Sequence, residues 1–280
     1  MKHSNTFLFI PASSEKFLTK SLTLSPFCLI YDLEDSVLTK DKEEALKRLA
    51  DFLLTNKFEN TKIAIRLNSD NYINELTYLL DKKVEFDYIV LPKFESASVL
   101  QEAINFLRSR RDSKKLILII ESALGHYEIN RIKFEKEHLD HIFGLFIGTN
   151  DLSSDLNSEI ESEIVAKIKL DLALHAKYLN VHFIDAPEFD INNQQKVLDV
   201  CTYNKRNGIT YKASIHPKHL EWIDSVYSVS EEEYLQAKKA IEILNEKGAY
   251  NLDGKMIDKA NLEKLYNIVQ KYEERNNLSK

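Results

Sequence analysis

Glycine, cysteine and proline are all scarce in this sequence of 280 residues, which contains six glycines, two cysteines and five prolines. A dinucleotide-binding fingerprint or a P-loop needs several glycines at fixed spacing, and neither pattern occurs. Nucleotide cofactors therefore lack their usual sequence support. Cys28 and Cys201 are far apart and form no CxxC motif, so we expect free thiols in a reducing compartment.

Long apolar runs and an excess of basic residues are also missing. No run approaches the roughly 20 apolar residues of a membrane helix. The first run, Phe7 to Ile10, is too short for a signal peptide and stops at Pro11. The 38 basic and 44 acidic side chains give a net charge of -6, which disfavours nonspecific binding to nucleic acid or to a membrane surface. We expect a cytoplasmic protein with neither partner.

A repeated unit is the main positive feature of the sequence. Short apolar, β-branched runs alternate with longer amphipathic segments of helical period. The runs are FLFIP, CLIYDLED, KIAIRLN, DYIVLPK, KLILIIES, HIFGLFIGTND, VHFIDAPEFD and YKASIHP. Continuous Val, Ile and Leu in such runs is typical of parallel strands buried on both faces. Eight βα units predict an α/β protein with a (β/α)8 TIM barrel, whereas the rival doubly wound sheet usually has about six strands.

The chain has no linker rich in Pro, Gly or Ser, so a single barrel over residues 1–228 is the default prediction. Residues 229–280 exceed what a barrel needs. They comprise a helix-like segment, a small turn at Gly248, the string NLDGKMID and a final amphipathic helix to about Arg275. We expect this C-terminal helical extension either to cap the barrel or to pack on a neighbouring subunit.

Polar residues follow each apolar run on its C-terminal side. In a barrel these strand ends meet at one mouth, where active sites are built. The residues are Asp32, Glu34, Asp35, Arg66, Asn68, Lys93, Glu121, Thr149, Asn150, Asp151, Asp185 and His216. Several carboxylates would then face Arg66 and Lys93 at the barrel mouth. Because unpaired buried charge is costly, this arrangement indicates a bound cation or an anionic ligand.

Glu121 and Asp151 are the predicted metal ligands. Two carboxylates from neighbouring strands, completed by water and substrate, suit Mg²⁺ or Mn²⁺, because Mg²⁺ keeps several waters and rarely uses an all-protein cage. The alternative is structural: both residues precede predicted helices, where acids serve as N-caps or first-turn residues.

Further roles at the mouth follow from residue type. Arg66 suits a substrate carboxylate or a developing enolate oxygen, and its alternative is a salt bridge to the acids after the second run. Lys93 is a substrate-binding candidate whose alternative is a structural ion pair. Asp32 and Glu34 alternate along one strand, and we expect both to contribute to catalysis by holding metal-bound water. His216 either orients substrate or is a structural histidine.

Eight motifs in order give the sequence a family resemblance. They are FIPASSEKF, YDLEDSV, IRLN, LPKFESA, IIESALG, GTNDLSSDL, ASIHP and LDGKMID, and they extend from Phe7 to Asp258. The set resembles the HpcH/HpaI aldolase and citrate lyase beta-subunit family of the phosphoenolpyruvate/pyruvate superfamily. The resemblance implies a (β/α)8 barrel that cleaves or forms carbon–carbon bonds, often in CoA or acyl-carrier thioesters.

The resemblance also implies roles for particular residues. Glu121 and Asp151 would bind Mg²⁺, and Arg66 would stabilise an enolate or oxo group. The metal would chelate a 2-oxo acid such as oxaloacetate, pyruvate or glyoxylate. Asp258 would transfer a proton from the tail of a neighbouring subunit, which implies a homo-oligomer, a trimer or hexamer.

Three positions depart from the family pattern. Ala12 and Asn157 stand where relatives usually have glycine, and Asn150, a substrate-binding candidate, stands where an acid is usual. These positions lie near the path that a thioester arm would take. Two alternatives therefore stay open: an aldolase for free 2-oxo acids that needs no CoA, and a barrel subunit without catalytic activity.

Overall fold

The computed structural model describes residues 4–252 and 255–276. Eight parallel strands close into a barrel in chain order, and β1 pairs with both β2 and β8. The strands are β1 (Thr6–Pro11), β2 (Cys28–Asp32), β3 (Lys62–Arg66), β4 (Tyr88–Leu91), β5 (Lys115–Ile120), β6 (Ile142–Ile147), β7 (His182–Asp185) and β8 (Tyr211–Ser214). Each coincides with one of the eight apolar runs, with β1 beginning one residue earlier than its run, so the (β/α)8 prediction is confirmed.

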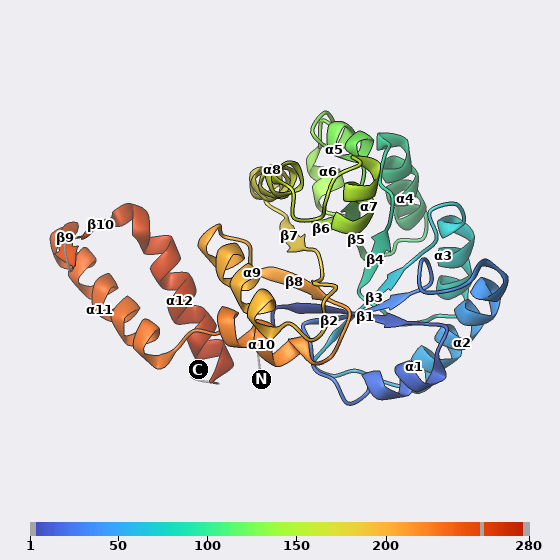
Figure 1. Ribbon diagram of the computed structural model, residues 1–280, viewed down its shortest axis with the longest axis horizontal. Coiled ribbons are helices and arrows are strands. Elements are labelled where there is room, and N and C mark those ends of the chain that lie inside the picture. Colours follow the sequence, from blue (N-terminus) through green and yellow to red (C-terminus); the bar gives the residue numbers. More distant parts are fainter. Residues whose placement is uncertain (1–3, 253–254, 277–280) are drawn as a thin grey trace. The chain divides into compact units, whose positions relative to one another are not determined.

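Helices surround the strands (Figure 1). They are α1 (Glu15–Ser21), α2 (Lys42–Thr55), α3 (Tyr72–Asp81), α4 (Ala97–Ser109), α5 (Ala123–Ile129), α6 (Lys136–Leu139), α7 (Thr149–Asp155), α8 (Glu163–Leu179), α9 (Gln194–Arg206) and α10 (His219–Tyr227), with a short 3-10 helix η1 (Thr39–Asp41) before α2. Helix α4 shows how the sequence specifies them. The Ser96 hydroxyl accepts a hydrogen bond from the Ser98 N–H at its start. Its buried residues Leu100, Ala103, Ile104 and Leu107 recur at helical spacing on one face.

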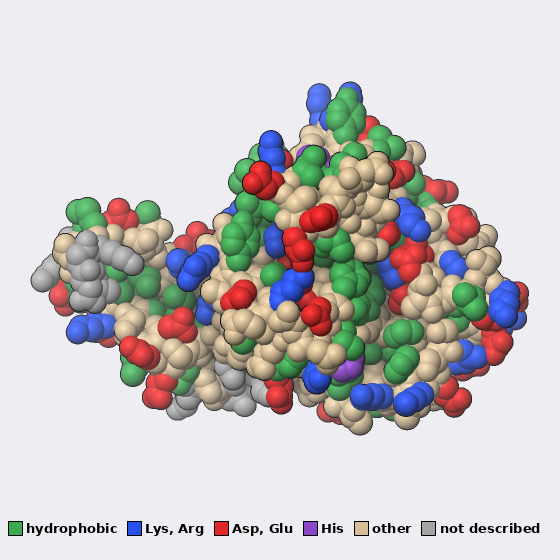
Figure 2. All heavy atoms as spheres, in the orientation of Figure 1, with side chains coloured by type: hydrophobic (Ala, Val, Ile, Leu, Met, Phe, Trp, Pro, Cys, Tyr) green, Lys and Arg blue, Asp and Glu red, His purple; other side chains and the backbone are tan. Residues whose placement is uncertain are grey.

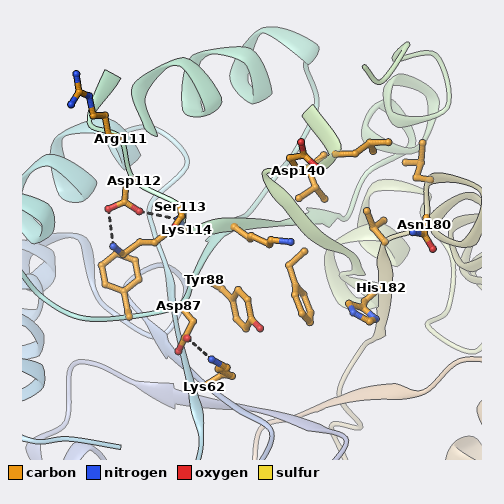
Figure 3. Close-up of a pocket in the computed structure, with 17 residues that line it drawn as sticks. Lys62, Asp87, Tyr88, Arg111, Asp112, Ser113, Lys114, Asp140, Asn180 and His182 are labelled. Carbon is orange, nitrogen blue, oxygen red and sulfur yellow. Dashed lines mark hydrogen bonds and ion pairs between the residues drawn. The ribbon is translucent and has the colours of Figure 1, made fainter. Parts of the chain in front are cut away.

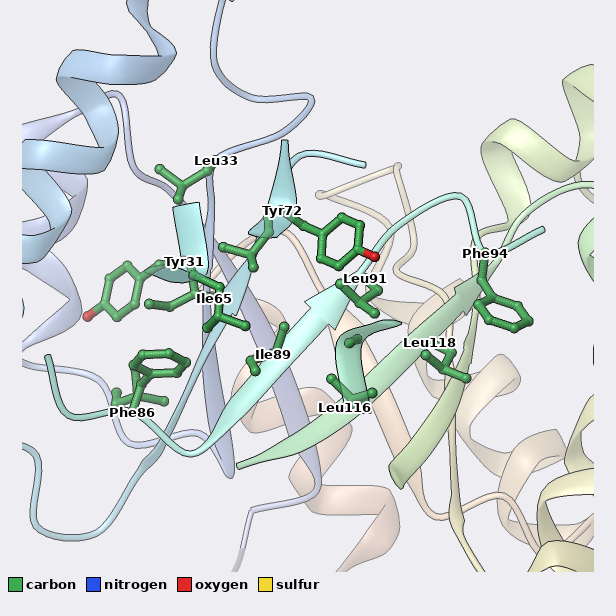
Figure 4. Packing of buried hydrophobic residues seen from close by; sticks show 14 of the residues in the cluster. Tyr31, Leu33, Ile65, Tyr72, Phe86, Ile89, Leu91, Phe94, Leu116 and Leu118 are labelled. Carbon is green, nitrogen blue, oxygen red and sulfur yellow. The ribbon is translucent and has the colours of Figure 1, made fainter. Parts of the chain in front are cut away.

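Side chains alternate between two buried layers along each strand. On β4, Ile89 and Leu91 belong to the outer cluster between strands and helices, whereas Tyr88 and Val90 belong to the inner cluster. Figure 4 shows outer-layer residues of β2 to β5 and of the flanking segments packed together. A strand buried on both faces has no polar side, which explains why the runs read as continuously apolar.

The chain forms two compact units, Asn5–Ile223 and a second one made of Met1–Ser4 with Asp224–Lys280. The second unit contains α11 (Glu231–Lys247), the antiparallel pair β9 (Ala249–Leu252) and β10 (Lys255–Asp258), the 3-10 helix η2 (Lys259–Asn261) and α12 (Leu262–Arg275). Tyr234 and Tyr272 stack with ring centroids 4.3 Å apart and join α11 to α12.

The segment from Gly248 through NLDGKMID, for which only a turn was predicted, thus contains two paired strands within an otherwise helical extension. Gly248 ends α11 with a φ of 75°, a left-handed conformation that glycine adopts at little cost. That residue turns the chain from the helix directly into β9, which is why the turn expected at Gly248 is followed by a strand.

The surface carries both signs of charge. On the face shown in Figure 2, Lys and Arg side chains are interspersed with Asp and Glu rather than collected in one patch. Both cysteines are free, as the sequence predicted, and both are buried. No helix in the described part of the chain is both long and apolar enough to cross a membrane.

Candidate active site

Strand alternation places three ionisable side chains inside the barrel at its C-terminal end. On β5, Ile119 belongs to the inner cluster and Glu121 is the next inward position. In the same way, Asp32 lies two residues after the inward-facing Ile30 on β2, and Arg66 lies two residues after the inward-facing Ala64 on β3. These residues therefore occupy the layer directly above the apolar inner core, at the end of the barrel that carries active sites in this fold.

A cavity of about 370 Å³ lies at this end. Acids, one guanidinium and apolar groups share its wall. It is lined by Phe9, Pro11, Asp32, Asp35, Ser36, Arg66, Ile119, Glu121, Phe146, Gly148, Thr149, Asn150, Asp151, Pro187, Phe189 and Ile215. The predicted site residues Asp32, Arg66, Glu121, Asn150 and Asp151 are thus gathered in one cavity.

Arg66 is held by a two-pronged ion pair. Its Nε donates to Asp32 Oδ1 at 2.7 Å and its Nη2 donates to Asp32 Oδ2 at 2.8 Å. The guanidinium carbon lies 5.1 Å from the centroid of the Phe9 ring, in cation–π geometry. Burial alone would raise the pKa of Asp32, but the hydrogen bonds and charge of Arg66, together with hydrogen bonds from Ser36 and the Glu34 N–H, outweigh it and the pKa is lowered. Asp32 therefore stays ionised and fixes the orientation of Arg66.

Glu34 and Asp35 extend this pair into a network. Arg66 Nη1 lies 3.0 Å from Glu34 Oε2 and 3.1 Å from Asp35 Oδ2. Lys93 Nζ lies 2.6 Å from Glu34 Oε1. Burial raises the pKa of Glu34 against the opposing effects of Lys93 and Arg66. The ion pairs considered for Arg66 and Lys93 are thus present, and neither Glu34 nor Lys93 is among the described residues that line the cavity.

Glu121 and Asp151 form a second acidic group beside this network. Burial is the main factor that raises the pKa of Glu121 to about 8, and the negative charges of Asp151 and Glu34 add to the effect. Glu121 Oε1 accepts a hydrogen bond of 2.6 Å from the backbone N–H of Lys93. The charge of Arg66 opposes this shift, but no lysine or arginine among the described residues forms an ion pair with either acid.

The donor set fits a hard divalent cation. Among the described residues, the ion pairs of Arg66 and Lys93 go to Asp32, Glu34 and Asp35 and none goes to Glu121 or Asp151. No group of three or more His, Cys, Asp or Glu side chains in this part of the chain could hold a metal ion. That rules out a closed zinc-type cage there, whereas Mg²⁺ commonly binds through one or two carboxylates and several waters.

Gly148 gives Glu121 the space it occupies. A Cβ atom at Gly148 would lie 2.5 Å from Glu121 Oε2 and 2.6 Å from Glu121 Cβ. No side chain can be accommodated there without moving the carboxylate. The glycine of the GTND string thus has a steric function that the motif alone did not reveal.

Short helices position the two acids. Ser122 is the N-cap of α5, and its hydroxyl accepts a hydrogen bond of 3.0 Å from the Gly125 N–H. The helix-cap alternative considered for Glu121 is therefore wrong, because the neighbouring serine caps the helix. Asp151 lies in the first turn of α7, where the helix dipole also favours an acid.

Two further predicted site residues, His216 and Asp258, make hydrogen bonds within their own turns. His216 is tied into the turn after β8, where its Nδ1 accepts from the Lys218 N–H at 3.1 Å, and it is not among the described residues that line the cavity. Asp258 ends β10 in the C-terminal unit. It is exposed, and its Oδ1 accepts a hydrogen bond of 2.9 Å from the Ala260 N–H as the cap of η2.

Asp185 does not belong to the mouth, although it ends a strand. It stands one residue after the inward-facing Ile184 and so points outward, between the barrel and its helices. There Lys212 Nζ donates to Asp185 Oδ2 at 2.9 Å, and Lys169 Nζ lies 3.3 Å from Oδ1. Its position at the end of a strand predicted that Asp185 would face the barrel mouth. The alternation of side chains along β7 instead places it in the outer layer.

A larger cavity of about 830 Å³ lies at the opposite end of the barrel (Figure 3). Two of its lysines are paired with acids: Lys62 Nζ lies 2.8 Å from Asp87 Oδ1, and Lys114 Nζ lies 2.9 Å from Asp112 Oδ2. Residues at the N-terminal ends of barrel strands generally serve stability. Volume alone therefore does not identify the candidate site, and the smaller cavity is the one lined by the predicted site residues.

The sequence reasoning missed the apolar part of the active-site wall. Phe9 and Phe146 stand at inward positions near the strand ends, and Pro187 and Phe189 come from the loop after β7. Phe9 could have been found by extending the period-2 pattern of β1. The two loop residues carry no comparable signal, because loop conformation decides what they contact.

Comparison with known proteins places the chain in a family. The sequence model of the HpcH/HpaI aldolase/citrate lyase family matches residues 5–217. The chain belongs to that family. Both activities in the family name break carbon–carbon bonds, and membership classes the protein as a carbon–carbon lyase. The resemblance drawn from the eight motifs is confirmed.

Individual members of the family align along almost the whole chain. Citrate lyase subunit beta from Haemophilus influenzae is 26% identical, over 92% of this chain and 93% of its own length. Mitochondrial citramalyl-CoA lyase from Homo sapiens is 26% identical, over 94% of this chain and 83% of its own. The crystal structure of CitE from Mycobacterium tuberculosis, in complex with magnesium, acetoacetate and coenzyme A, matches with a TM-score of 0.78 and 20% identity, covering 96% of this chain and 98% of that one.

Proposed function

We propose that this protein is a magnesium-dependent lyase that splits a 3-hydroxy-acyl thioester into a 2-oxo acid and an acyl thioester, or joins the two. The acid pair Glu121 and Asp151, set beside the fixed guanidinium of Arg66 in one cavity, carries the proposal. Similar proteins are a citramalyl-CoA lyase and a citrate lyase subunit, and CitE was crystallised with magnesium and coenzyme A. Oxaloacetate, pyruvate and glyoxylate are the 2-oxo acids we expect.

Each side chain has a defined task in this reaction. When bound by Glu121 and Asp151, Mg²⁺ supplies Lewis-acid stabilisation of the oxo-acid oxygens. Arg66 retains an Nη2–H beyond the one donated to Asp32 and can donate it to a carboxylate or enolate oxygen. Asp32, whose pKa is lowered, serves to orient Arg66 and is a poor proton acceptor.

A base must remove the proton from the 3-hydroxyl group as the carbon–carbon bond breaks, and an acid must protonate the departing enolate carbon. We assign the proton transfer to Asp258, which is exposed and makes its hydrogen bonds within its own turn. It would act in the site of a neighbouring subunit, which makes the functional unit a homo-oligomer. Asn150 lines the cavity, and we assign it the donation of an amide hydrogen to substrate.

The direct test is a cleavage assay with citryl-CoA, citramalyl-CoA and malyl-CoA, in which the released 2-oxo acid is trapped as its hydrazone. We expect turnover with at least one substrate, loss of turnover with chelator and recovery with Mg²⁺. Glu121→Gln and Asp151→Asn should abolish both turnover and Mn²⁺ binding. The matched control is Asp140→Asn, a carboxylate at the opposite end of the barrel. Full activity in either site variant would overturn the assignment.

The carrier is a separate question that the same assay answers. Each thioester is compared with its free acid at equal concentration. A thioester requirement predicts cleavage of citramalyl-CoA with little or no cleavage of citramalate. Equal rates would instead indicate an aldolase for free acids, which the departures at Ala12, Asn150 and Asn157 would favour. No cleavage of any compound, together with no Mn²⁺ binding, would indicate a non-catalytic barrel.

A further inference from the structure

We propose that the left-handed backbone of Lys93 is a positioning device that aims the Glu121 carboxylate at the metal. The inference rests on the proposed metal site and adds a residue that acts on it through its main chain. Lys93 has a φ of 50°, a conformation that residues with a side chain adopt only at a cost. Its N–H donates to Glu121 Oε1 at 2.6 Å.

The direction of the chain explains why this conformation is needed. Strand β4 ends at Leu91, and the next residue, Pro92, has no N–H to donate. The N–H groups of Lys93 and Phe94 both turn to β5, the first to the Glu121 carboxylate and the second to the Ile119 carbonyl oxygen at 3.1 Å. Two consecutive backbone N–H groups thus hold the loop after β4 against the end of β5 by hydrogen bonds.

The Glu121 carboxylate is held on one side by the Lys93 N–H and is confined on the other side by Gly148. Oε1 receives the Lys93 N–H, and Oε2 occupies the space that a Cβ at Gly148 would fill. One lone pair of Oε1 is used by the backbone, and the remaining oxygen lone pairs stay available for a cation. A carboxylate held in this way loses little conformational freedom on binding a metal.

The Lys93 side chain has a different task from its backbone. Its ammonium pairs with Glu34 and lies 3.8 Å from Asp35, so it neutralises the acidic network around Arg66. Main chain and side chain therefore serve two neighbouring parts of the site. Substitutions can separate them, because glycine and asparagine tolerate the left-handed conformation whereas valine and isoleucine do not.

The experiment measures Mn²⁺ affinity by the electron paramagnetic resonance signal of the free ion, without substrate. Lys93→Gly, Lys93→Asn, Lys93→Val and Lys93→Ile all remove the ammonium. We expect the glycine and asparagine variants to bind alike, and the valine and isoleucine variants to bind about tenfold more weakly than these. If Lys93→Val does not fold, Lys93→Ala compared with Lys93→Gly gives the same ordering with a smaller difference.

Lys83 provides a matched control, since it is a lysine with a φ of 58° in the loop between α3 and β4. Lys83→Val should lower the Tm relative to Lys83→Gly while Mn²⁺ affinity stays unchanged. Equal Mn²⁺ affinity of Lys93→Gly and Lys93→Val, in a protein whose Mn²⁺ binding is abolished by Glu121→Gln, would overturn this inference and leave the proposed function intact. Failure of the unmodified protein to bind Mn²⁺ would overturn both.

Discussion

Single residues decide where the negative charge of the cavity lies. Asp32 and Glu121 stand at equivalent inward positions of two strands, yet Asp32 is paired with Arg66 and its pKa is lowered, whereas the pKa of Glu121 is raised to about 8. Both side chains are buried, but Asp32 receives two hydrogen bonds from the Arg66 guanidinium, whereas the charges of Asp151 and Glu34 add to the effect of burial on the pKa of Glu121. The Asp32 carboxylate therefore orients Arg66, and the Glu121 carboxylate remains available to bind a cation.

Gly148→Ala tests the space around Glu121. We expect the added methyl group to displace the carboxylate, because its carbon would lie 2.5 Å from Glu121 Oε2. Mn²⁺ affinity and turnover should fall by more than about tenfold, a loss of about 1.4 kcal/mol in binding free energy. Gly208→Ala is the control: its Cβ meets nothing within 4 Å, and its φ of 77° should cost stability without touching the metal site. Unchanged Mn²⁺ affinity in Gly148→Ala would contradict the steric argument.

Arg66→Lys tests the two-pronged pair with Asp32. A lysine keeps the charge but cannot donate to both carboxylate oxygens in the fixed geometry of the guanidinium. We expect turnover to fall at least about 100-fold with Mn²⁺ affinity changed less than about threefold, since oxyanion donors act mainly on the transition state. A fall in Mn²⁺ affinity as large as the fall in turnover would show that Arg66 acts through the metal ligands instead.

Secondary-structure elements are joined by a second buried charge network in the outer layer. Lys212 on β8 is 1% exposed and donates to Asp185 on β7 and to Glu188 in the following loop. Lys169 on α8 also approaches Asp185. Since the same loop contributes Phe189 to the cavity wall, this network links barrel stability to the shape of the site.

Removing one partner of this pair should be costly. Lys212→Met leaves the Asp185 carboxylate with less compensation in a buried place, and we expect a loss of about 3–5 kcal/mol in the free energy of unfolding. The double variant Lys212→Met, Asp185→Leu removes both charges and should recover part of that loss. Urea denaturation of the three proteins provides the measurement. A double variant less stable than Lys212→Met would show that the pair stabilises by more than mutual compensation.

The same pair predicts how stability depends on acidity. Burial opposes ionisation of Asp185, but Lys212 and Lys169 lower its pKa from 3.8 to about 2. A lowered folded-state pKa means that the contribution is complete above the unfolded value and is lost as the pH falls. We therefore expect a stability decrease between about pH 4 and pH 2 that is smaller in the Lys212→Met, Asp185→Leu variant. Parallel curves for both proteins would exclude Asp185 as its source.

The whole molecule combines a barrel that carries the cavity with a C-terminal unit that carries Asp258. Two helices and a pair of strands form that unit, and a structure of this size cannot bury a large core of its own. Exposed apolar side chains such as Leu235, Met256 and Tyr266 accompany Asp258 there. We propose that this unit docks on the barrel of a neighbouring copy.

Subunit mixing tests this arrangement. Asp258→Asn and Arg66→Ala are each expected to be inactive. If Asp258 serves a neighbouring barrel, some sites in co-refolded oligomers combine the intact barrel of the Asp258→Asn variant with the intact C-terminal unit of the Arg66→Ala variant. Random mixing at equal amounts makes this about one site in four, so activity should return to about one quarter of the unmodified level. Light scattering should show a trimer or hexamer. An absence of recovered activity in a confirmed mixed oligomer would place Asp258 in the site of its own subunit, and full activity of Asp258→Asn alone would place it outside catalysis.

The sequence alone determined the barrel, because eight apolar runs separated by amphipathic segments allow few other ways to bury both faces of every strand. It also indicated Arg66, Glu121 and Asp151, since polar residues at the ends of such strands converge at one mouth. The paired strands β9 and β10 were not predicted, because the two short strands are stabilised by pairing with each other rather than by a strong apolar pattern.

Only the tertiary structure decided how the charges are shared. Asp32 and Asp185 both end apolar runs, but one side chain faces the cavity and the other the outer layer, and a shift of one residue along a strand reverses that direction. The role of Gly148 beside Glu121 and that of the Lys93 N–H likewise depend on distances between segments far apart in the chain. Charge pairing and steric space are properties of three-dimensional proximity, which a list of residue types does not contain.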